Sequence, residues 1–361
     1  MKFTKAVLAS ALLSIGLVIT TPASAVSYYS GIDLGTLLGG TWSTANGINA
    51  SGQVVGTAGT AVATRHAFIT GANGVGMTDL GTMGGNYSTA TGINASGQMV
   101  GTRTIVGDQA YITGANGVSV TSLGTLGGAQ SSGYGINDSG QVVGSAQLVG
   151  NATSHAYITG ANGVGMTDIG TLGGLYSLGY GINASGQVVG YSDLAGSPKV
   201  THAFVTGANG VGMTDIGTLG GKDSYAYGIN ASGQAVGNSL LAGNATIHAF
   251  ITGANGVGIT DLNDLVKWES PFGGPSYDYF TNANGINDLG QVIVGSSSGH
   301  AYLLTPASAP GVIIGRAAIV PVPAAGWLLG SGLVGMLSFA RKRDDQLVTR
   351  DGQQAWASFA V

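Results

Sequence analysis

The sequence predicts an all-β fold, a six-bladed β-propeller within an exported chain. A ten-residue stretch, GINASGQVVG, recurs with spacings of 45, 43, 46, 47 and 57 residues, and no helical apolar pattern accompanies it. A repeat of this length built only from strand-like segments is typical of propeller blades. A β-solenoid is the alternative fold. The six copies begin at Gly47, Gly92, Gly135, Gly181, Gly228 and Gly285.

Each repeat contains four strand candidates. The first is a run such as Ser88 to Asn94, and a turn of the Asn-Ala-Ser-Gly type leads to the second, Gln-Val-Val-Gly. The third is His-Ala-Phe/Tyr-Ile-Thr, and the turn Gly-Ala-Asn-Gly leads to the fourth, Met-Thr-Asp-Leu/Ile-Gly-Thr-Leu. Asn, Ser and Gly suit hairpin turns because they accept positive φ and bond the local backbone. Repeated strand glycines suit close backbone approaches. A four-stranded meander cannot bury both faces alone, so we expect the repeats to stack.

The two ends of the array predict that the ring closes. The segment 31–40, GIDLGTLLGG, is a fourth strand without a preceding blade, and the last repeat ends at His300 to Thr305 without a fourth strand of its own. We expect the N-terminal strand to complete the last blade, because closure removes exposed sheet edges.

The repeat motifs also resemble a known family. The patterns D-[LI]-G-T-[LM]-G-G, G-I-N-x-S-G-Q-V-V-G and H-A-[FY] recur between Ile32 and Thr305. This region resembles the HAF family of probable extracellular repeats. The resemblance implies an exported bacterial repeat protein and brings no established chemistry with it.

The N-terminus has the features of a signal peptide. Lys2 and Lys5 precede an apolar run, and Ala23-Ser24-Ala25 forms a small-x-small cleavage pattern. We therefore expect a signal peptide at 1–25, a mature chain from Val26 and a propeller at 26–308. An uncleaved N-terminal anchor is the alternative.

The C-terminus predicts a membrane segment. Residues 324–340 carry no charge and follow a linker at 309–323, and a basic cluster opens the tail at 341–361. Seventeen helical residues span about 25 Å, slightly less than a hydrocarbon core of about 30 Å. The basic cluster predicts a cytoplasmic tail. A buried core helix is the alternative.

This arrangement resembles the PEP-CTERM sorting signal of Gram-negative bacteria. It implies processing by an exosortase-type enzyme in an organism that makes exopolysaccharide, with the product at the cell surface or in the extracellular matrix. Val322 stands where the family has Glu, and 18 residues follow the basic cluster. The residues of the motif are Val320, Pro321, Val322, Pro323, Arg341, Lys342 and Arg343.

Composition excludes some partners of the repeat region. Residues 26–310 contain 13 Asp plus Glu and 5 Lys plus Arg, a net charge of −8 that disfavours nucleic acid and anionic lipid. The chain has no Cys, so stability must come from packing and strand pairing rather than disulfides. The 66 glycines accompany 44% hydrophobic residues, which favours a packed fold over a linker.

Every histidine occupies one repeat position. Equivalent positions on the outer strands of a ring lie too far apart to share a metal ion, whose bonds to nitrogen are about 2.0–2.1 Å, so we predict neither a metal nor another cofactor. An Asp follows four of the histidines by 13 residues, and Gln109 and Ser122 replace the pair in one repeat. We predict a cross-strand hydrogen bond in each blade between residues approximately opposite each other, with His300 meeting Asp33 through closure. The four pairs are His66–Asp79, His155–Asp168, His202–Asp215 and His248–Asp261.

One segment interrupts the repeat and supplies a candidate ligand site. The segment 263–280 adds about ten residues and concentrates aromatic side chains beside carboxylates. Such a loop suits carbohydrate, and a plug before the last blade is the alternative. The candidate residues are Trp268, Glu269, Phe272, Tyr277 and Tyr279.

Enzymatic signals are scarce. Glycosidases usually need two placed carboxylates, whereas Glu269 is the chain's single Glu, and no nucleophile elbow, zinc helix or phosphate loop occurs. We predict a non-enzymatic surface or matrix protein with a structural or binding role linked to exopolysaccharide. A polysaccharide-active hydrolase or lyase on a propeller scaffold is the alternative.

Overall fold

The computed structural model describes residues 33–37, 39–62, 64–196, 200–268, 278–306 and 312–314. The predicted signal peptide, transmembrane segment and basic tail lie outside this range, as does the predicted linker except for β25 (Val312–Ile314). Among the described residues, no helix combines the length and apolar character required to cross a bilayer.

The fold is all-β, and its strands follow the six sequence repeats. The first repeat contains β1 (Ser43–Ile48), β2 (Val54–Gly59), β3 (Arg65–Thr70) and β4 (Met77–Asp79). The second contains β5 (Tyr87–Ile93), β6 (Met99–Thr104), β7 (Asp108–Thr113) and β8 (Val120–Ser122). The third contains β9 (Gly127–Ile136), β10 (Val142–Leu148), β11 (Ser154–Thr159) and β12 (Met166–Gly170).

The remaining repeats follow the same order. The fourth contains β13 (Gly173–Ile182), β14 (Val188–Leu194), β15 (Thr201–Thr206) and β16 (Met213–Gly217). The fifth contains β17 (Gly220–Ile229), β18 (Ala235–Leu241), β19 (Ile247–Thr252) and β20 (Ile259–Asp261). The sixth contains β22 (Phe280–Ile286), β23 (Val292–Ser296) and β24 (Ala301–Leu304), and β21 (Val266–Trp268) pairs in parallel with β25.

Short 3-10 turns join the third and fourth strands of the first five repeats. Their central Asn has φ near 55°, a left-handed conformation that Asn accepts more readily than most residues, as the predicted turn requires. These turns are η1 (Ala72–Gly74), η2 (Ala115–Gly117), η3 (Ala161–Gly163), η4 (Ala208–Gly210) and η5 (Ala254–Gly256), and η6 (Leu262–Leu265) follows β20.

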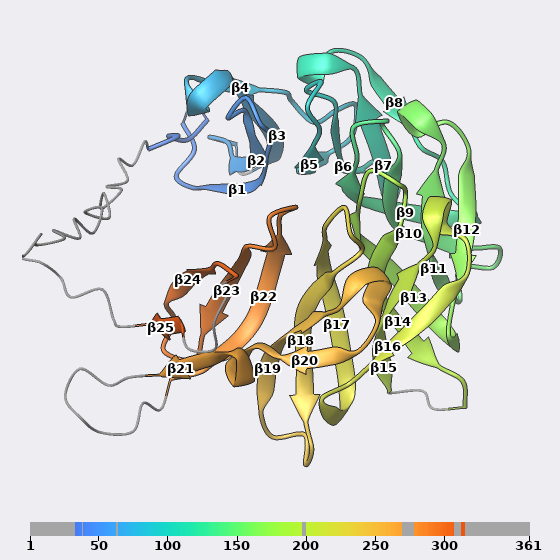
Figure 1. Cartoon of the computed structure of the whole chain (residues 1–361). Helices are drawn as coiled ribbons and strands as arrows, with labels where there is room; N and C mark the ends of the chain where they lie inside the picture. The colour runs from blue at the N-terminus through green and yellow to red at the C-terminus, as the bar shows by residue number, and fades with distance from the viewer. Residues whose placement is uncertain are drawn as a thin grey trace, which may run out of the picture.

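The strands form antiparallel meanders arranged as in a β-propeller (Figure 1). The first, second and fifth repeats are separate four-stranded sheets. The third and fourth repeats join into one eight-stranded sheet through a single parallel pairing of Ser154 with Tyr176. The described part therefore has four sheets of four or more strands and a three-stranded sixth repeat, which differs from the predicted six separate blades.

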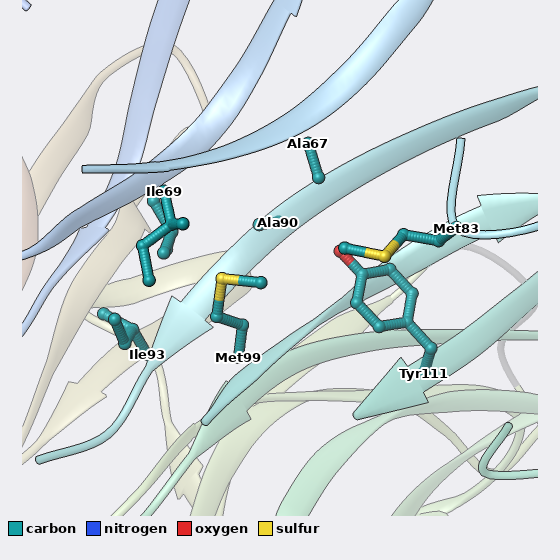
Figure 2. Packing of buried hydrophobic residues seen from close by; sticks show 8 residues of the cluster. Ala67, Ile69, Met83, Ala90, Ile93, Met99 and Tyr111 are labelled. Atoms are coloured by element: carbon teal, nitrogen blue, oxygen red, sulfur yellow. The ribbon is translucent and has the colours of Figure 1, made fainter. Parts of the chain in front are cut away.

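The core lies between successive repeats. Ile69 of the first repeat packs with Ile93, Met99 and Tyr111 of the second (Figure 2), and Val55 belongs to the same cluster. Each of these side chains is at most 8% exposed. Apolar side chains of one repeat are therefore buried against the next repeat, as the repeat pattern predicted.

Strand glycines set the distance between the first and second strands of the first five repeats. A Cβ on Gly190 would collide with the carbonyl oxygen of Leu178, and one on Gly144 would collide with that of Ser132. The same contact recurs at Gly56, Gly101 and Gly237. The predicted close approach is therefore confirmed at these positions.

Closure by an N-terminal strand is not observed. The described residues 33–37 and 39–42 contain no strand, and none of the described pairings joins them to β24. The segment contacts the first repeat instead, because Ser43 Oγ donates to Gly35 O at 2.7 Å and Leu37 is buried against Val54 and Phe68.

The two ends of the array consequently expose faces that inner repeats bury. Ile48 is 68% exposed, whereas the equivalent Ile93 is 8% exposed. At the other end, Ile293 is 52% exposed although the equivalent Val55 is fully buried, and Leu303 is 54% exposed. These residues occupy the positions that contact a neighbouring repeat elsewhere.

Candidate functional site

The asparagine of each Gly-Ile-Asn motif connects one repeat to the next. Asn183 Nδ2 donates to Asn230 O at 3.0 Å, and its Oδ1 accepts from the Ser185 and Gln187 backbone N–H groups. Equivalent bonds run from Asn49 to Asn94 and on through Asn137, so that five bonds join the six repeats. We call this series the asparagine ladder. This ladder was not predicted, although an Asn present in all six copies of the motif was the available signal.

The glutamine of the motif adds a second connection. Gln187 Nε2 donates to Asn255 Oδ1 in the turn of the following repeat at 3.1 Å, and Gln53 makes the same bond to Asn116 at 2.8 Å. The Asn and Gln of the recurring motif therefore join successive repeats through hydrogen bonds.

The first strands of all six repeats border one pocket of about 270 Å³. Each repeat contributes the Gly-Ile pair of its motif, from Gly47 and Ile48 to Gly285 and Ile286. Neither residue type carries a side-chain polar group, so this axial pocket offers no side-chain chemistry.

The predicted His–Asp hydrogen bonds are confirmed in four repeats. The His Nδ1 atom lies 2.6–3.0 Å from an Asp carboxylate oxygen in each pair. In three pairs the carboxylate is 38–44% exposed, and the fourth, His248–Asp261, is more buried. The Asp also accepts from the backbone N–H two residues later, as Asp168 does from Gly170 at 2.7 Å. The pair therefore fixes the start of the segment that leads to the next repeat.

The predicted register of these pairs was wrong. Asp79 lies opposite Phe68 rather than His66, so the bonded residues are diagonal neighbours on one face. Diagonal side chains remain within reach when one of them is long. In the repeat with Gln109 and Ser122, no hydrogen bond joins the two side chains among the described contacts, so that prediction was wrong.

The predicted pairing of His300 with Asp33 is also not found. His300 Nδ1 lies 3.0 Å from Ser298 Oγ, and Asp33 accepts from the Gly35 backbone N–H. The physical reason is that the N-terminal segment contacts the first repeat and does not reach β24.

A Ser–His–Asp cluster in the sixth repeat lacks the order of a catalytic triad. Asp278 accepts from Ser297 Oγ and Ser298 Oγ, so the carboxylate contacts the serine instead of orienting the histidine. Partial burial would raise the pKa of Asp278, but hydrogen bonds from Ser298 and Ser297 outweigh it and lower the pKa to about 2. The cluster ties the start of β22 to the turn after β23.

Tyrosines fill the boundary between the fourth and fifth repeats. Tyr191 and Tyr225 lie with ring centroids 5.2 Å apart, and Tyr180 contacts both Tyr191 and Tyr227. Tyr134 extends the group at 5.4 Å from Tyr180. Burial raises the pKa of these phenols, which keeps them neutral.

A pocket of about 510 Å³ opens at the next boundary, between the fifth and sixth repeats. The described residues of its lining have aromatic, amide, hydroxyl and aliphatic side chains, and none of these described residues is charged. Asn238 Nδ2 donates to Tyr227 OH at 3.3 Å, and the Tyr279 ring lies 5.0 Å from the His248 ring. We call it the amide pocket; its lining residues are Tyr227, Asn238, Ala245, Thr246, Ile247, Tyr279, Thr281, Asn282 and Asn284.

Of the candidate ligand residues, the structure places only Tyr279 in this pocket. The backbone of Trp268 ends β21, while Glu269, Phe272 and Tyr277 lie outside the described residues, as do all residues of the sorting motif. Tyr227, Asn238 and Asn282 were not predicted, because their role depends on which side chains meet between repeats. No cluster of three or more His, Cys, Asp or Glu suited to a metal occurs in the part of the chain that the structure describes.

A second pocket of about 490 Å³ borders the first repeat and the N-terminal segment. Thr36 and Leu37 lie on one side, and the His66–Asp79 pair lies on the other. His66 and Asp79 are hydrogen-bonded to each other, so this pocket offers a ligand fewer unpaired polar groups than the amide pocket does.

Comparison with known proteins gives structural similarity only. No family model matches the sequence, and no curated protein does. Putative TolB from Agrobacterium tumefaciens is 11% identical with a TM-score of 0.45, over 61% of this chain and 79% of that chain. TolB from Acinetobacter baumannii is 11% identical with a TM-score of 0.45, over 73% of this chain and 65% of that chain. The β-propeller domain of the Trilobed protease from Pyrococcus furiosus is 10% identical with a TM-score of 0.48, over 75% and 82%.

Proposed function

We propose that this chain is an exported bacterial surface or matrix protein whose propeller-like domain has a binding and structural role linked to exopolysaccharide. The observation that carries the proposal is the amide pocket. Tyr279, from the interrupting segment, and Tyr227 provide aromatic rings, and three asparagines and two threonines provide hydrogen-bonding groups. Aromatic rings together with uncharged polar groups suit the apolar faces and hydroxyls of sugars.

A non-enzymatic role is supported by the hydrogen bonds that hold five of the described Asp carboxylates. Four Asp side chains are bonded to histidines, and Asp278 is held by serines. Hydrolysis of a glycosidic bond usually requires two carboxylates about 5–10 Å apart across the sugar. None of the described residues that line the amide pocket is a carboxylate. A polysaccharide-active hydrolase or lyase remains the competing proposal, and two carboxylates whose substitution abolishes glycan cleavage would favour it.

Export and surface sorting rest on the two ends of the sequence. The signal-peptide pattern at 1–25 and the sorting-signal pattern from Val320 to Arg343 support passage through the inner membrane and processing by an exosortase-type enzyme. Mass spectrometry of the surface form tests this proposal. A mature N-terminus at Val26 and a cut near Pro323 are expected, and an intact chain of 361 residues would contradict it.

We further propose that the six repeats close into a six-bladed ring. The axial pocket with one Gly-Ile pair from each repeat supports this proposal, as do the exposed faces at Ile48 and at Ile293. Val55 of the first repeat and Ile93 of the second lie in one buried cluster, so the equivalent Ile293 and Ile48 would meet in a closed ring. The chain has no Cys, so Ile48→Cys and Ile293→Cys can be combined and treated with a short bis-maleimide. An intramolecular crosslink is expected. A product of two chains, or no crosslink, would contradict closure, and each single variant serves as control.

The binding role is tested with the purified full chain on a glycan array and by co-sedimentation with exopolysaccharide of the producing cells. Saturable binding to at least one polysaccharide is expected. Absence of binding to every glycan and to the native exopolysaccharide would refute the proposed function.

A further inference from the structure

The amide pocket is located where four tyrosine positions of the preceding boundary become one tyrosine and three asparagines. Tyr191 directly follows Gly190, as Asn238 follows Gly237, and Tyr225 lies four residues before the motif isoleucine, as Asn282 does. Between the fourth and fifth repeats these positions hold Tyr180, Tyr191, Tyr225 and Tyr227. Between the fifth and sixth repeats they hold Tyr227, Asn238, Asn282 and Asn284.

This exchange accounts for the cavity. Between the fourth and fifth repeats, the Tyr191 and Tyr225 rings are in edge contact and occupy the space between the sheets. An asparagine side chain is much smaller than a tyrosine, and packed interiors leave few voids unless side chains are missing. The three replacements, Asn238, Asn282 and Asn284, therefore remove ring volume at this boundary, and the pocket there is about 510 Å³, within the range of about 300–1,000 Å³ that small-molecule sites occupy.

The pocket also retains unused hydrogen-bonding capacity. Asn282 Nδ2 donates to Asn284 Oδ1 at 2.8 Å, and Asn238 Nδ2 donates to Tyr227 OH. Among the described contacts, Asn238 Oδ1, Asn284 Nδ2 and Tyr279 OH have no hydrogen-bond partner. An acceptor, a donor and a hydroxyl thus face one space, which matches the mixed donor and acceptor character of sugar hydroxyls.

We propose that the amide pocket is a subsite for a neutral sugar unit, opened by Asn238 and Asn282 in place of tyrosines. The proposal rests on the proposed function and names the site and the ligand class. Among the described lining residues there is no Lys or Arg to pair with a uronic acid or sulfate and no carboxylate to bind an amino sugar. Tyr279 and Tyr227 supply the ring faces, and the asparagines bond the hydroxyls.

The test fills the pocket with the side chains of its neighbour. The double variant Asn238→Tyr with Asn282→Tyr restores the tyrosine pair of the preceding boundary. Isothermal titration of the full chain with neutral gluco-, galacto- and manno-oligosaccharides should show at least a tenfold loss of affinity for the double variant. Tyr279→Ala should show a similar loss without filling the space. Tyr176→Ala, at a half-exposed tyrosine of the fourth repeat, serves as the matched control and should bind as the unaltered chain does.

The outcomes separate this inference from the proposed function. If the unaltered chain binds neutral sugars and both the double variant and Tyr279→Ala bind equally well, the subsite lies elsewhere and the inference is refuted while the binding role stands. Preference for polygalacturonate or another anionic glycan would also refute the inference alone. If no glycan binds at all, both proposals fail. If the double variant does not fold, the affinities of Tyr279→Ala and Tyr176→Ala for neutral sugars are compared instead. Equal affinities would refute the inference.

Discussion

Replacing Asn183 by alanine should destabilise the fold far more than replacing Ser185 of the same turn by alanine. The buried Asn183 side chain makes five hydrogen bonds, to Asn230 O, Gln187 Oε1, the backbone N–H groups of Ser185 and Gln187, and Ser185 Oγ. The variant Asn183→Ala removes all five, and it breaks one of the five bonds of the asparagine ladder.

The free-energy cost of Asn183→Ala depends on whether each former partner finds another hydrogen bond. Ser185 is exposed and regains water, so its two bonds cost little. The Gln187 N–H is buried and has no other partner, which costs about 1–3 kcal/mol. The Asn230 carbonyl keeps a hydrogen bond from the Gly233 N–H. Loss of the bonds from Asn183 Nδ2 to Asn230 O and to Gln187 Oε1 should therefore cost about 0.5–1.5 kcal/mol each. The expected cost is therefore about 4 kcal/mol in free energy of unfolding, within a range of about 2–6 kcal/mol.

Urea unfolding followed by circular dichroism measures this cost, provided that the slope with denaturant stays unchanged. Ser185→Ala is the matched control, because it removes only the hydroxyl bond to Asn183 Oδ1, and its cost should be about 0.5 kcal/mol. A cost for Asn183→Ala below about 1 kcal/mol, or equal to that of the control, would refute the role given to the ladder.

Three further predictions follow from individual contacts. Tyr157 is fully buried with an unbonded hydroxyl, whereas Tyr111 OH donates to Thr89 O at 3.0 Å. In thermal unfolding, Tyr157→Phe should therefore be neutral or stabilising, and Tyr111→Phe should cost about 1 kcal/mol; equal effects would contradict this. Asp168→Asn should cost less than about 1 kcal/mol in free energy of unfolding, because the carboxylate is 38% exposed and its interaction with His155 is screened by water. Asp168→Ala should cost more, because it also loses the bond from the Gly170 N–H. The reverse order in urea unfolding would contradict this account. The pKa of Asp278 is lowered in the folded state, so its carboxylate contributes stability above pH 3.8 that is lost as the pH falls towards 2. The gap in melting temperature between the unaltered chain and Asp278→Asn should therefore shrink over that window, and a constant gap would argue against it.

The repeat architecture could be predicted from the sequence because it depends on local periodicity. Strand order, the Asn turns and the close approach at Gly190 follow from spacing and residue type. The His155–Asp168 bond was also predictable, although its diagonal register was not, because the turn pairs Thr159 with Met166 and so sets Asp168 opposite Tyr157.

Features that depend on contacts between repeats could not be predicted. The amide pocket results from Asn238 and Asn282 meeting across a boundary, and neither residue is unusual within its own repeat. The N-terminal segment matches a fourth strand in sequence, yet it packs on the first repeat through Leu37 and Ser43. Sequence identity between repeats indicates which segments are equivalent and leaves open which neighbour each end will contact.

The asparagine ladder also bears on the order in which the molecule can acquire its structure. Every ladder bond connects a repeat to the one directly after it, over 43 to 57 positions. These bonds between adjacent repeats close far smaller loops than a contact between the first and last repeats does, and smaller loops close at lower entropic cost. Each repeat can therefore dock on its predecessor as soon as it leaves the ribosome or a translocation pore, and only contact between the first and last repeats must wait for the whole polypeptide.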